Sequence, residues 1–314
     1  MARTLFTNVS IFDGTGSGLF SGEVLIDGNR IVKVAKGQGQ IDKNSANDVV
    51  DGGGATLMPG MVESHGHLQF GSTVDRIERN RDFTPEKMQM VAIHAAKVLM
   101  DYGMTSVFSG GARNTPAEIA LKAEIEGGWL PGPRLRTCSF EMIAGEQAHV
   151  AGQARQRNYR GTDGRDPEDS KCREFVKQMA DIGAESVKFL ISGESANTPG
   201  SSRQVQFYES EIHAAADEAR KHGLWLVAHC HAAESVKIAC RAGFNVLYHC
   251  TWADPEGIDM IVAQKDRIFV GPAPGINWAN MYEAAEFGVT RESAEKREKF
   301  ITFDLVSKVM PELL

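Results

Sequence analysis

Two histidines stand one residue apart at the end of a short apolar run, in the segment MPGMVESHGH at positions 58–67. In an extended strand the side chains of residues i and i+2 point to the same side, so His65 and His67 can converge on one point. Two converging imidazoles make half of a metal site. The plainer interpretation is a strand that ends in two solvated histidines, and this segment alone does not decide between the two.

Three further side chains, Lys188, His229 and His249, fall in later segments that are typical of strands. Each has a structural explanation on its own, because a lone histidine in a strand is more often a hydrogen-bonded core residue, and Lys188 can cap a strand or pair with Glu194. The three segments are ESVKFLIS at 185–192, LWLVAHC at 224–230 and NVLYHC at 245–250. Together with the first two histidines, these residues predict a metal site built on strands that share one mouth.

Lys188 needs separate chemistry, because an ammonium has no lone pair to offer a metal ion. Burial beside other cations lowers the pKa of a lysine. The free amine can then capture carbon dioxide and become a carbamate, whose two oxygens can bridge two metal ions. We therefore expect two divalent ions, one held by His65 and His67 and the other by His229 and His249, with N6-carboxylated Lys188 between them. Zinc is the default ion for a histidine-rich site.

Two more histidines are candidates for catalysis. His231 lies two residues after His229 and shares its face of the strand, so it can touch a substrate. His149 lies in the polar, glycine-rich segment 141–168, which reads as a long loop. Long loops in compact domains are usually functional or mobile, so His149 can reach the mouth of the site.

The part of the chain before the first histidine pair is β-rich. Residues 4–12 and 23–35 read as strands separated by Gly/Ser-rich turns. We expect residues 1–57 to form a small N-terminal β-sandwich segment that precedes the main domain in the chain.

From residue 58 onwards the pattern alternates between strand and helix, which is typical of a (β/α) barrel. A doubly wound sheet is the alternative. However, polar residues follow the strands throughout the series and not at one switch point, so we favour a TIM-like (β/α) barrel over 58–314. After the first strand, further strands are expected at 104–109, 134–140, 185–192, 224–230, 245–250 and 267–272, and helices from 84 to 102 and at 115–126, 168–182, 208–222, 233–242, 255–264 and 289–314.

The composition excludes several classes of protein. The net charge of -7 and the pI near 5.8 argue against a nucleic-acid-binding surface. No apolar run approaches the roughly 18 residues of a membrane span. The five cysteines are an odd number without zinc-ribbon spacing, and the first residues lack the apolar core of a signal peptide, so we expect reduced thiols in the cytoplasm. We also expect a homo-oligomer that acts on a small molecule.

The motifs and their order resemble the amidohydrolase superfamily, close to its imidazolonepropionase-like and Xaa-Pro-dipeptidase-like branch. The resemblance covers essentially the whole chain and implies a β-sandwich plus TIM-like barrel, a binuclear metal site and hydrolysis of amide-like C–N bonds. It is carried by PGMVESHGH at 59–67, which resembles the family's PG(M/L)xDxHxH strand, by GAESVK at 183–188, which resembles its GAxxxK segment, and by AHCHAAE, AG and LYHCT within 228–251, which resemble its HAHxxE…AG…IEHG run.

The chain departs from the family pattern in two places. Glu63 stands where the family usually has Asp, which is one methylene shorter. The metal-binding, proton-shuttling Asp of the family's eighth strand has no candidate, since Asp304 lies in a helical stretch, EKFITFDLVSKV. We therefore expect the eighth strand to be missing from this chain, the barrel to be incomplete at its C-terminal end, and a gap to separate the first and seventh strands.

These observations predict a metal-dependent amidohydrolase. Through a metal-bound hydroxide it would hydrolyse an amide, carbamate or urea-type C–N bond, other than a peptide bond, in a small molecule or N-capped amino acid. A deaminase of a cyclic amidine is an alternative, although that branch typically uses one metal and no bridging lysine, so Lys188 argues against it. A non-catalytic relative that keeps the metal site is another, and the absent Asp leaves it open.

Overall fold

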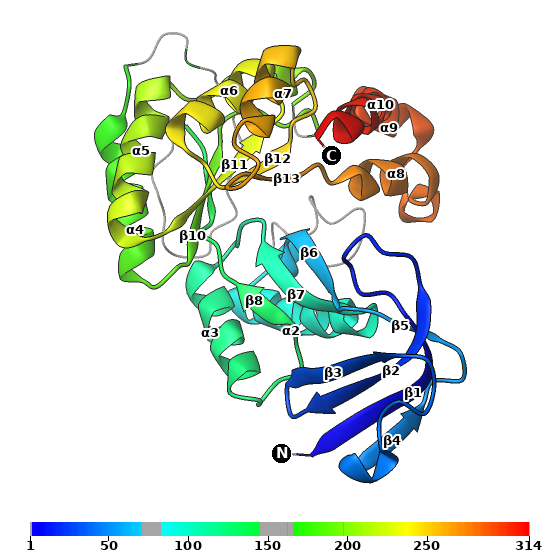
Figure 1. Cartoon of the computed structure of the whole chain (residues 1–314). Coiled ribbons are helices and arrows are strands. Elements are labelled where there is room, and N and C mark those ends of the chain that lie inside the picture. Colours follow the sequence, from blue (N-terminus) through cyan, green and yellow to red (C-terminus); the bar gives the residue numbers. More distant parts are fainter. Residues whose placement is uncertain (1, 71–82, 145–161, 163–165, 197, 314) are drawn as a thin grey trace. The chain divides into compact units, whose positions relative to one another are not determined.

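The structure is a computed structural model that describes residues 2–70, 83–144, 162, 166–196 and 198–313 (Figure 1). The chain divides into two compact units, Met1–Met61 and Val62–Leu314. No helix of the described residues is long and apolar enough to cross a bilayer.

The first unit is one five-stranded sheet organised around its long first strand, β1. One end of β1 pairs in parallel with β4 and the other with β5, while β2 lies antiparallel to β1 and to β3. Apolar side chains lie on both faces of this sheet. The sandwich predicted for residues 1–57 is therefore wrong in detail, because both short strands join the sheet of β1 and no second sheet forms among the described residues. The strands are β1 (Arg3–Ile11), β2 (Phe20–Asp27), β3 (Arg30–Lys36), β4 (Asp48–Asp51) and β5 (Thr56–Leu57).

The second unit alternates strands and helices, close to the boundaries that the sequence predicts. Side chains of Thr84, Asn114 and Asp254 cap three of the helices by accepting backbone N–H groups. The strands are β6 (Met61–Gly66), β7 (Met104–Ser109), β8 (Arg134–Arg136), β9 (Glu141–Met142), β10 (Ser186–Leu190), β11 (Trp225–Cys230), β12 (Val246–His249) and β13 (Phe269–Gly271). The helices are α2 (Pro85–Asp101), α3 (Thr115–Glu126), α4 (Asp169–Asp181), α5 (Glu209–His222), α6 (Ala233–Ala242), α7 (Pro255–Val262), α8 (Pro274–Tyr282), α9 (Arg291–Lys296) and α10 (Lys299–Val309).

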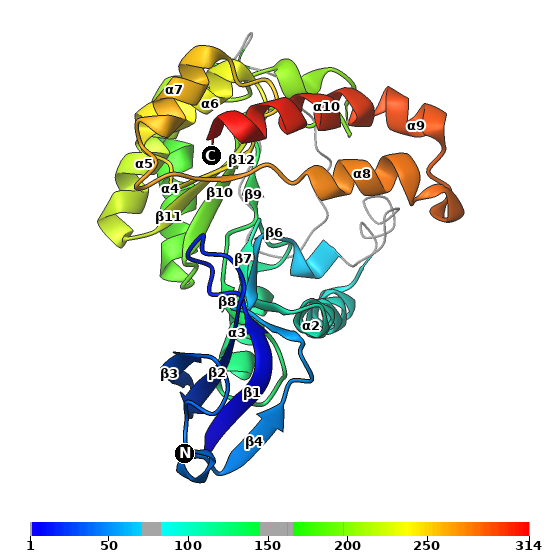
Figure 2. The same ribbon diagram turned by 45° about the vertical axis from the view of Figure 1, so that its right-hand side comes forward.

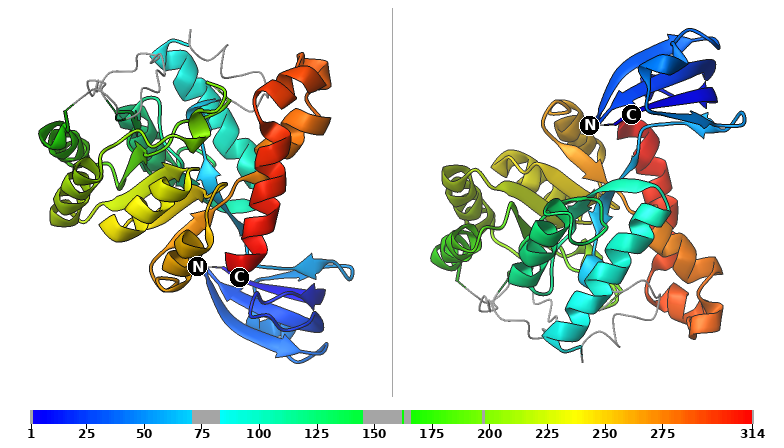
Figure 3. Two further views of the ribbon diagram at one scale, coloured as in Figure 1. Left: turned by 90° about the horizontal axis from the view of Figure 1, so that it is seen from above. Right: turned by 90° about the horizontal axis from the view of Figure 1, so that it is seen from below.

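The strands of this unit form two sheets, in the orders β6-β7-β8 and β13-β12-β11-β10-β9. The neighbours within the larger sheet pair in parallel, as do β7 and β8. Helices α4 to α7 lie along one side of the larger sheet (Figures 1 and 3). The two sheets meet where Ala112 bridges Phe140 in parallel and Ser139 N donates to Ser186 O at 2.9 Å.

A buried apolar cluster fixes the larger sheet against its helices. Phe189 of β10 is fully buried and meets the rings of Phe175, Phe207 and Phe244 edge-on, with centroid distances of 5.5 to 6.4 Å. All five cysteines are free thiols buried in this unit. The carboxyl ends of β10 to β12 are therefore held on a rigid frame.

The sequence prediction differs from the structure at the third strand. Of the expected strand 134–140 only β8 is a strand, and β9 begins just after that range, because carboxylates take the place of a strand ladder in between. Thr137 N donates to the side chain of Glu185, and Cys138 N donates to that of Glu118, both at 2.9 Å.

The C-terminal region also differs from the prediction of one helix at 289–314. Glu298 has a left-handed backbone, with φ of +57°, and separates α9 from α10. Helix α8, which the sequence analysis did not anticipate, begins at Pro274 and packs beside α10, where the rings of Trp278 and Phe303 lie 5.7 Å apart (Figure 2).

Strands β6 and β13 lie at the edges of their sheets, and no ladder joins them within the described ranges. A hydrogen bond crosses from β12 to β6 instead, since the Tyr248 hydroxyl donates to Ser64 O at 2.7 Å. It ties the first strand of the unit to the larger sheet.

Glu118 of α3 is a buried carboxyl that fastens its helix to two strand ends. Its Oε2 accepts from the Ser109 hydroxyl at 3.0 Å, and its Oε1 accepts from Cys138 N. Burial raises the pKa of Glu118 to about 7, although both hydrogen bonds act in the opposite direction.

We expect the Glu118→Gln variant to show a flatter dependence of stability on pH. A carboxyl whose pKa is raised from 4.5 to about 7 on folding stabilises the protein fully below 4.5, and this stabilisation is lost as the pH rises through 7. The loss corresponds to an order of 3 kcal/mol for the wild type. Urea unfolding at several pH values measures it. Glu126→Gln, an exposed change on the same helix, is the control, and equal slopes in all three proteins would contradict this account.

Candidate metal centre

The structure brings the predicted metal-ligating residues together at one end of the parallel strands. They come from four strands of the second unit: His65 in β6 with His67 just after it, Lys188 in β10, His229 in β11, and His249 at the end of β12. His231 follows β11 directly. His149 lies outside the described residues.

The first pair converges as the period of two requires. The Nε2 atoms of His65 and His67 lie 3.3 Å apart, and the His67 Nδ1 lies 2.8 Å from Gly111 O. The His65 ring stacks on Tyr248 at a centroid distance of 3.6 Å. Its Nδ1 is buried with no hydrogen-bond partner among the described residues. Two imidazole nitrogens that converge in this way fit a shared divalent cation.

Glycines make this close approach possible. A Cβ on Gly110 would stand 2.3 Å from His65 Cδ2 and 3.0 Å from His67 Nε2. At Gly111, with φ of +131°, the backbone itself requires glycine. The loop after β7 therefore lies directly against the two rings.

A second group of donors lies at the ends of β10 to β12. Ligand atoms of Glu194, His229, His231 and His249 all lie within 4.8 Å of one another. Sequence analysis placed His229 and His249 here and gave His231 a catalytic role, but it did not identify Glu194 as a site residue. The available signal was its place just beyond β10, since polar residues at such strand ends converge on a common mouth.

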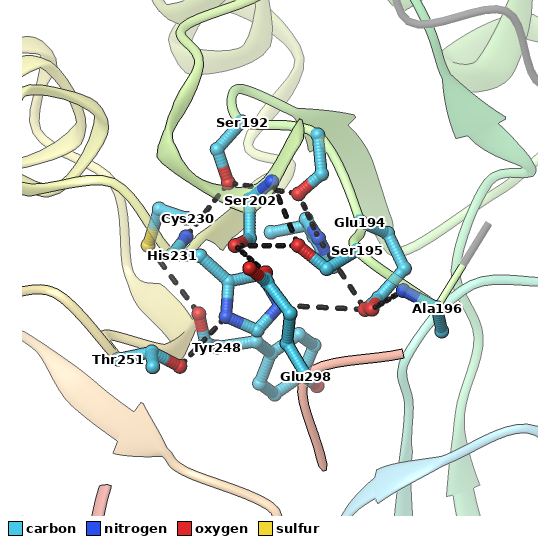
Figure 4. Close-up of polar contacts among 12 residues, drawn as sticks. Ser192, Glu194, Ser195, Ala196, Ser202, Cys230, His231, Tyr248, Thr251 and Glu298 are labelled. Carbon is cyan, nitrogen blue, oxygen red and sulfur yellow. Dashed lines mark hydrogen bonds and ion pairs between the residues drawn. The ribbon is translucent and has the colours of Figure 1, made fainter. Parts of the chain in front are cut away.

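Hydrogen bonds fix the orientation of this group (Figure 4). The Thr251 hydroxyl lies 2.7 Å from His231 Nδ1, and His231 Nε2 lies 3.3 Å from Glu194 Oε2. Ser192 Oγ accepts from the backbone of His231 at 2.7 Å, and Ala196 N donates to Glu194 Oε1 at 2.8 Å. The polar partners hold both side chains in one arrangement.

The backbone is strained at the end of β12. His249 and Cys250 have φ of +77° and +49°, in the left-handed region that non-glycine residues rarely adopt. Each such residue costs on the order of 1–3 kcal/mol, which the surrounding packing must offset. The turn stacks the His249 ring on His231 at 4.3 Å. The strained backbone at His249 and Cys250 therefore helps to place the His249 ring in the site.

Lys188 is fully buried between the two groups of donors. Its Nζ donates to Gly110 O at 2.7 Å and lies 4.2 Å from the centroid of the Tyr248 ring. As an ammonium it has no lone pair to offer a metal ion. Its position connects the loop after β7 with the histidines of the larger sheet.

The electrostatics favour neutral imidazoles. Burial, followed by the charge of Lys188, lowers the pKa of His65 well below its ordinary value, and burial followed by neighbouring histidines does the same for His249. Burial, with the charge of His231 next, lowers the pKa of His229 to about 3. The neutral ring is the form that binds a metal ion.

Glu194 stays ionised despite its position. Burial raises its pKa, but the charge of Lys299 and the hydrogen bond with His231 outweigh burial, so the pKa lies well below the ordinary value. Neutral imidazoles beside an ionised carboxylate are a donor set that fits a divalent cation such as zinc.

Two residues singled out by the sequence have other roles. Glu63, in place of the family's Asp, reaches back along its own strand, and its Oε1 accepts from His65 N at 2.8 Å. Asp304 lies in α10, as expected, and pairs with Lys308 on the surface. It lies on a helix and does not contact the histidines.

The family model described as "Amidohydrolase family" matches residues 56–271, more than half of the chain, so the chain belongs to the amidohydrolase family. No curated protein sequence matches it. It is similar in fold to several solved structures. One is a Xaa-Pro dipeptidase with bound methionine, with a TM-score of 0.82 and 24% identity over 99% of this chain and 77% of the other. A second is a prolidase complexed with N-methylphosphonate-L-proline, with a TM-score of 0.78 and 21% identity over 99% of this chain and 75% of the other. A third is an ochratoxinase from A. niger, with a TM-score of 0.74 and 18% identity over 98% of this chain and 72% of the other.

We expect Gly110→Ala to disrupt the centre without unfolding the chain. The new methyl group would overlap His65 and His67 and must push the two rings apart. Bound metal, measured by elemental analysis after reconstitution, should fall, while the circular dichroism spectrum stays unchanged. Gly275→Ala has nothing within 4 Å of the added methyl and is the matched control. Full metal content in the Gly110 variant would show that metal binding does not need the backbone at position 110 to lie against the two histidine rings.

Proposed function

We propose that the chain is a metal-dependent hydrolase of an amide, carbamate or urea-type C–N bond in a small molecule or N-capped amino acid. The observation that carries this proposal is the convergence of five histidines, Glu194 and Lys188 on the parallel strands and the loops that follow them. Membership of the amidohydrolase family supports hydrolysis of amide-type bonds. The relatives include a Xaa-Pro dipeptidase, so a peptide bond belongs among the candidates to be tested. We also propose that the two parallel sheets form a (β/α) barrel, as the alternation of strands and helices suggests.

In this proposal His65 and His67 hold one divalent ion, and Glu194, His229 and His249 hold a second, zinc being the default for such donors. Bound ions would supply Lewis-acid polarisation of the scissile carbonyl and a water of lowered pKa. The two ions and the identity of the metal are part of the proposal.

His231 is the residue that we propose for proton transfer. Its Nδ1 lies 2.7 Å from the Thr251 hydroxyl and its Nε2 lies 3.3 Å from Glu194 Oε2, so the ring is held in place at both nitrogens. In this proposal His231 would accept a proton from the attacking water and then, as the imidazolium, give it to the leaving nitrogen. His149 stays a second candidate for contact with the substrate.

A cytoplasmic location is a further part of the proposal. The five cysteines are buried free thiols, as is usual in a reducing compartment.

The test is turnover of a substrate panel by the zinc-loaded chain. N-acyl amino acids, carbamates, ureas and Xaa-Pro dipeptides are compared with a cyclic amidine, and product is measured by chromatography. We expect hydrolysis of at least one of the first four classes. We also expect His229→Ala to lower kcat/KM at least a hundredfold, because a metal donor is removed. This decrease corresponds to a loss of about 3 kcal/mol in transition-state stabilisation. His213→Ala, a partly exposed histidine on α5, is the control.

Two results of this assay would replace the proposal. Release of ammonia from the cyclic amidine alone would indicate a deaminase. Absence of turnover in every class by the metal-loaded chain would indicate a non-catalytic relative.

We further propose that Lys188 is N6-carboxylated when metal is bound. The neutral amine adds to the carbon of carbon dioxide and loses one proton, which gives a carbamate with two oxygens. The remaining N–H can still donate to Gly110 O, so the present hydrogen bond survives the modification.

We expect Lys188→Ala to bind fewer metal ions and to lose activity, with partial recovery when a short carboxylic acid is added, because the acid can occupy the place of the carbamate. NMR with isotopically labelled carbon dioxide should show a carbamate signal in the wild type that is absent from this variant. Lys171→Ala, at an exposed lysine, should keep both. Two fully occupied metal positions beside an unmodified amine would contradict the modification.

A further inference from the structure

The first histidine of the candidate centre lacks the hydrogen bond that its neighbour makes. A metal-ligating histidine usually directs its second ring nitrogen at a carboxylate, a carbonyl or water, which fixes the orientation of the ring. His67 follows this rule, since its Nδ1 lies 2.8 Å from Gly111 O while its Nε2 faces that of His65. The Nδ1 of His65 is buried and has no hydrogen-bond partner among the described residues. Another contact must therefore orient the His65 ring.

Tyr248 makes such a contact. Its ring lies parallel to the His65 imidazole, with an interplanar angle of 4° and a centroid distance of 3.6 Å. At this separation the two rings are in van der Waals contact over their faces, and a rotation of the imidazole out of its plane would bring its edge into the phenol ring. The stack therefore restricts the tilt of the His65 ring, which is what a hydrogen bond to Nδ1 does for other ligating histidines.

The Tyr248 ring is itself fixed by contacts from other strands. Its hydroxyl donates to Ser64 O of β6 at 2.7 Å, and the Nζ of Lys188 in β10 lies 4.2 Å from the ring centroid. A Cβ on Gly271 of β13 would stand 2.7 Å from Tyr248 Cδ1, so the ring also lies directly against that strand. The side chain of Tyr248 is fully buried. A ring held in this way can act as a rigid support for its neighbour.

We propose that Tyr248 is a positioning residue of the centre, whose ring takes the place of the absent hydrogen bond and holds the His65 imidazole so that Nε2 is directed at the first ion. Tyr248 itself supplies no ligand atom in this assignment, and its effect passes through His65. The inference rests on the proposed function for the presence of a metal pair. It adds that the larger sheet, through β12, orients a ligand that belongs to β6.

Zinc binding by the full chain, measured by competition with a chromophoric chelator and without substrate, tests this role. Tyr248→Leu removes the ring, and we expect the affinity for one of the two zinc ions to fall about 10- to 100-fold, the typical effect of losing a group that orients a ligand. The affinity for the other ion should stay unchanged. Tyr248→Phe keeps the ring and should recover most of the lost affinity. Tyr102→Leu, at an exposed tyrosine that follows α2, is the matched control and should keep both affinities.

A double-mutant cycle with His65→Ala separates positioning from a general effect on the sheet. If Tyr248 acts through His65, Tyr248→Leu causes no further loss of zinc affinity in a chain that already carries His65→Ala. Thermal unfolding of the metal-free variants shows whether each is folded. If Tyr248→Leu does not fold, Gly271→Ala replaces it, because the added methyl group would displace the same ring.

Equal zinc affinities in the wild type and in Tyr248→Leu would overturn the positioning role. So would additive losses in the cycle, weaker binding of both ions, or a loss in Tyr248→Phe as large as that in Tyr248→Leu. A wild type that binds fewer than two zinc ions would overturn it as well, because no separate ion would remain for His65 and His67. Selective loss of one ion, together with no turnover of any substrate class by the wild type, would leave the role of Tyr248 intact and refute the proposed function instead.

Discussion

The candidate centre depends on the close approach of the Gly110–Gly111 backbone to the first strand of the second unit. Gly110 N donates to Gly66 O at 2.7 Å, Gly110 O accepts from Lys188, and Gly111 O lies within hydrogen-bonding distance of His67. One dipeptide thus links β6, β7 and β10 at the point where their side chains meet. A side chain at either position would open this junction, and the histidines of β6 would no longer lie near those of β11 and β12.

The other half of the centre is built on a balance between strain and packing. The left-handed turn at His249 and Cys250 is unfavourable by itself, but the larger sheet beneath it is closed by tightly buried side chains. The same burial that offsets the strain removes water from the imidazoles and keeps them neutral. Glu194 stays ionised only because positive and hydrogen-bonding groups face it. Burial therefore both holds the turn at the end of β12 in place and keeps its histidines in the neutral form that can bind a metal ion.

Most of the architecture was predictable, because capping residues, stop glycines and apolar periodicity are local signals. The histidines of β6, β11 and β12 were found because a period of two and a place at a strand end are visible in one segment. Glu194 was missed because it follows its strand in an irregular loop, whose path depends on contacts with α10 that are distant in sequence. The split of β8 from β9 was missed for a similar reason, since it depends on Glu118 and Glu185 reaching in from other elements.

The burial of all five cysteines has a practical consequence. Each thiol is at most 2% exposed, and burial raises the pKa of Cys138, Cys230 and Cys240, so a thiol-modifying reagent cannot react with the closed state. Labelling must await a local opening, and its rate at each position reports how often that part of the second unit separates. The chain thus contains, without any substitution, five natural probes placed within and between the strands and helices of the second unit.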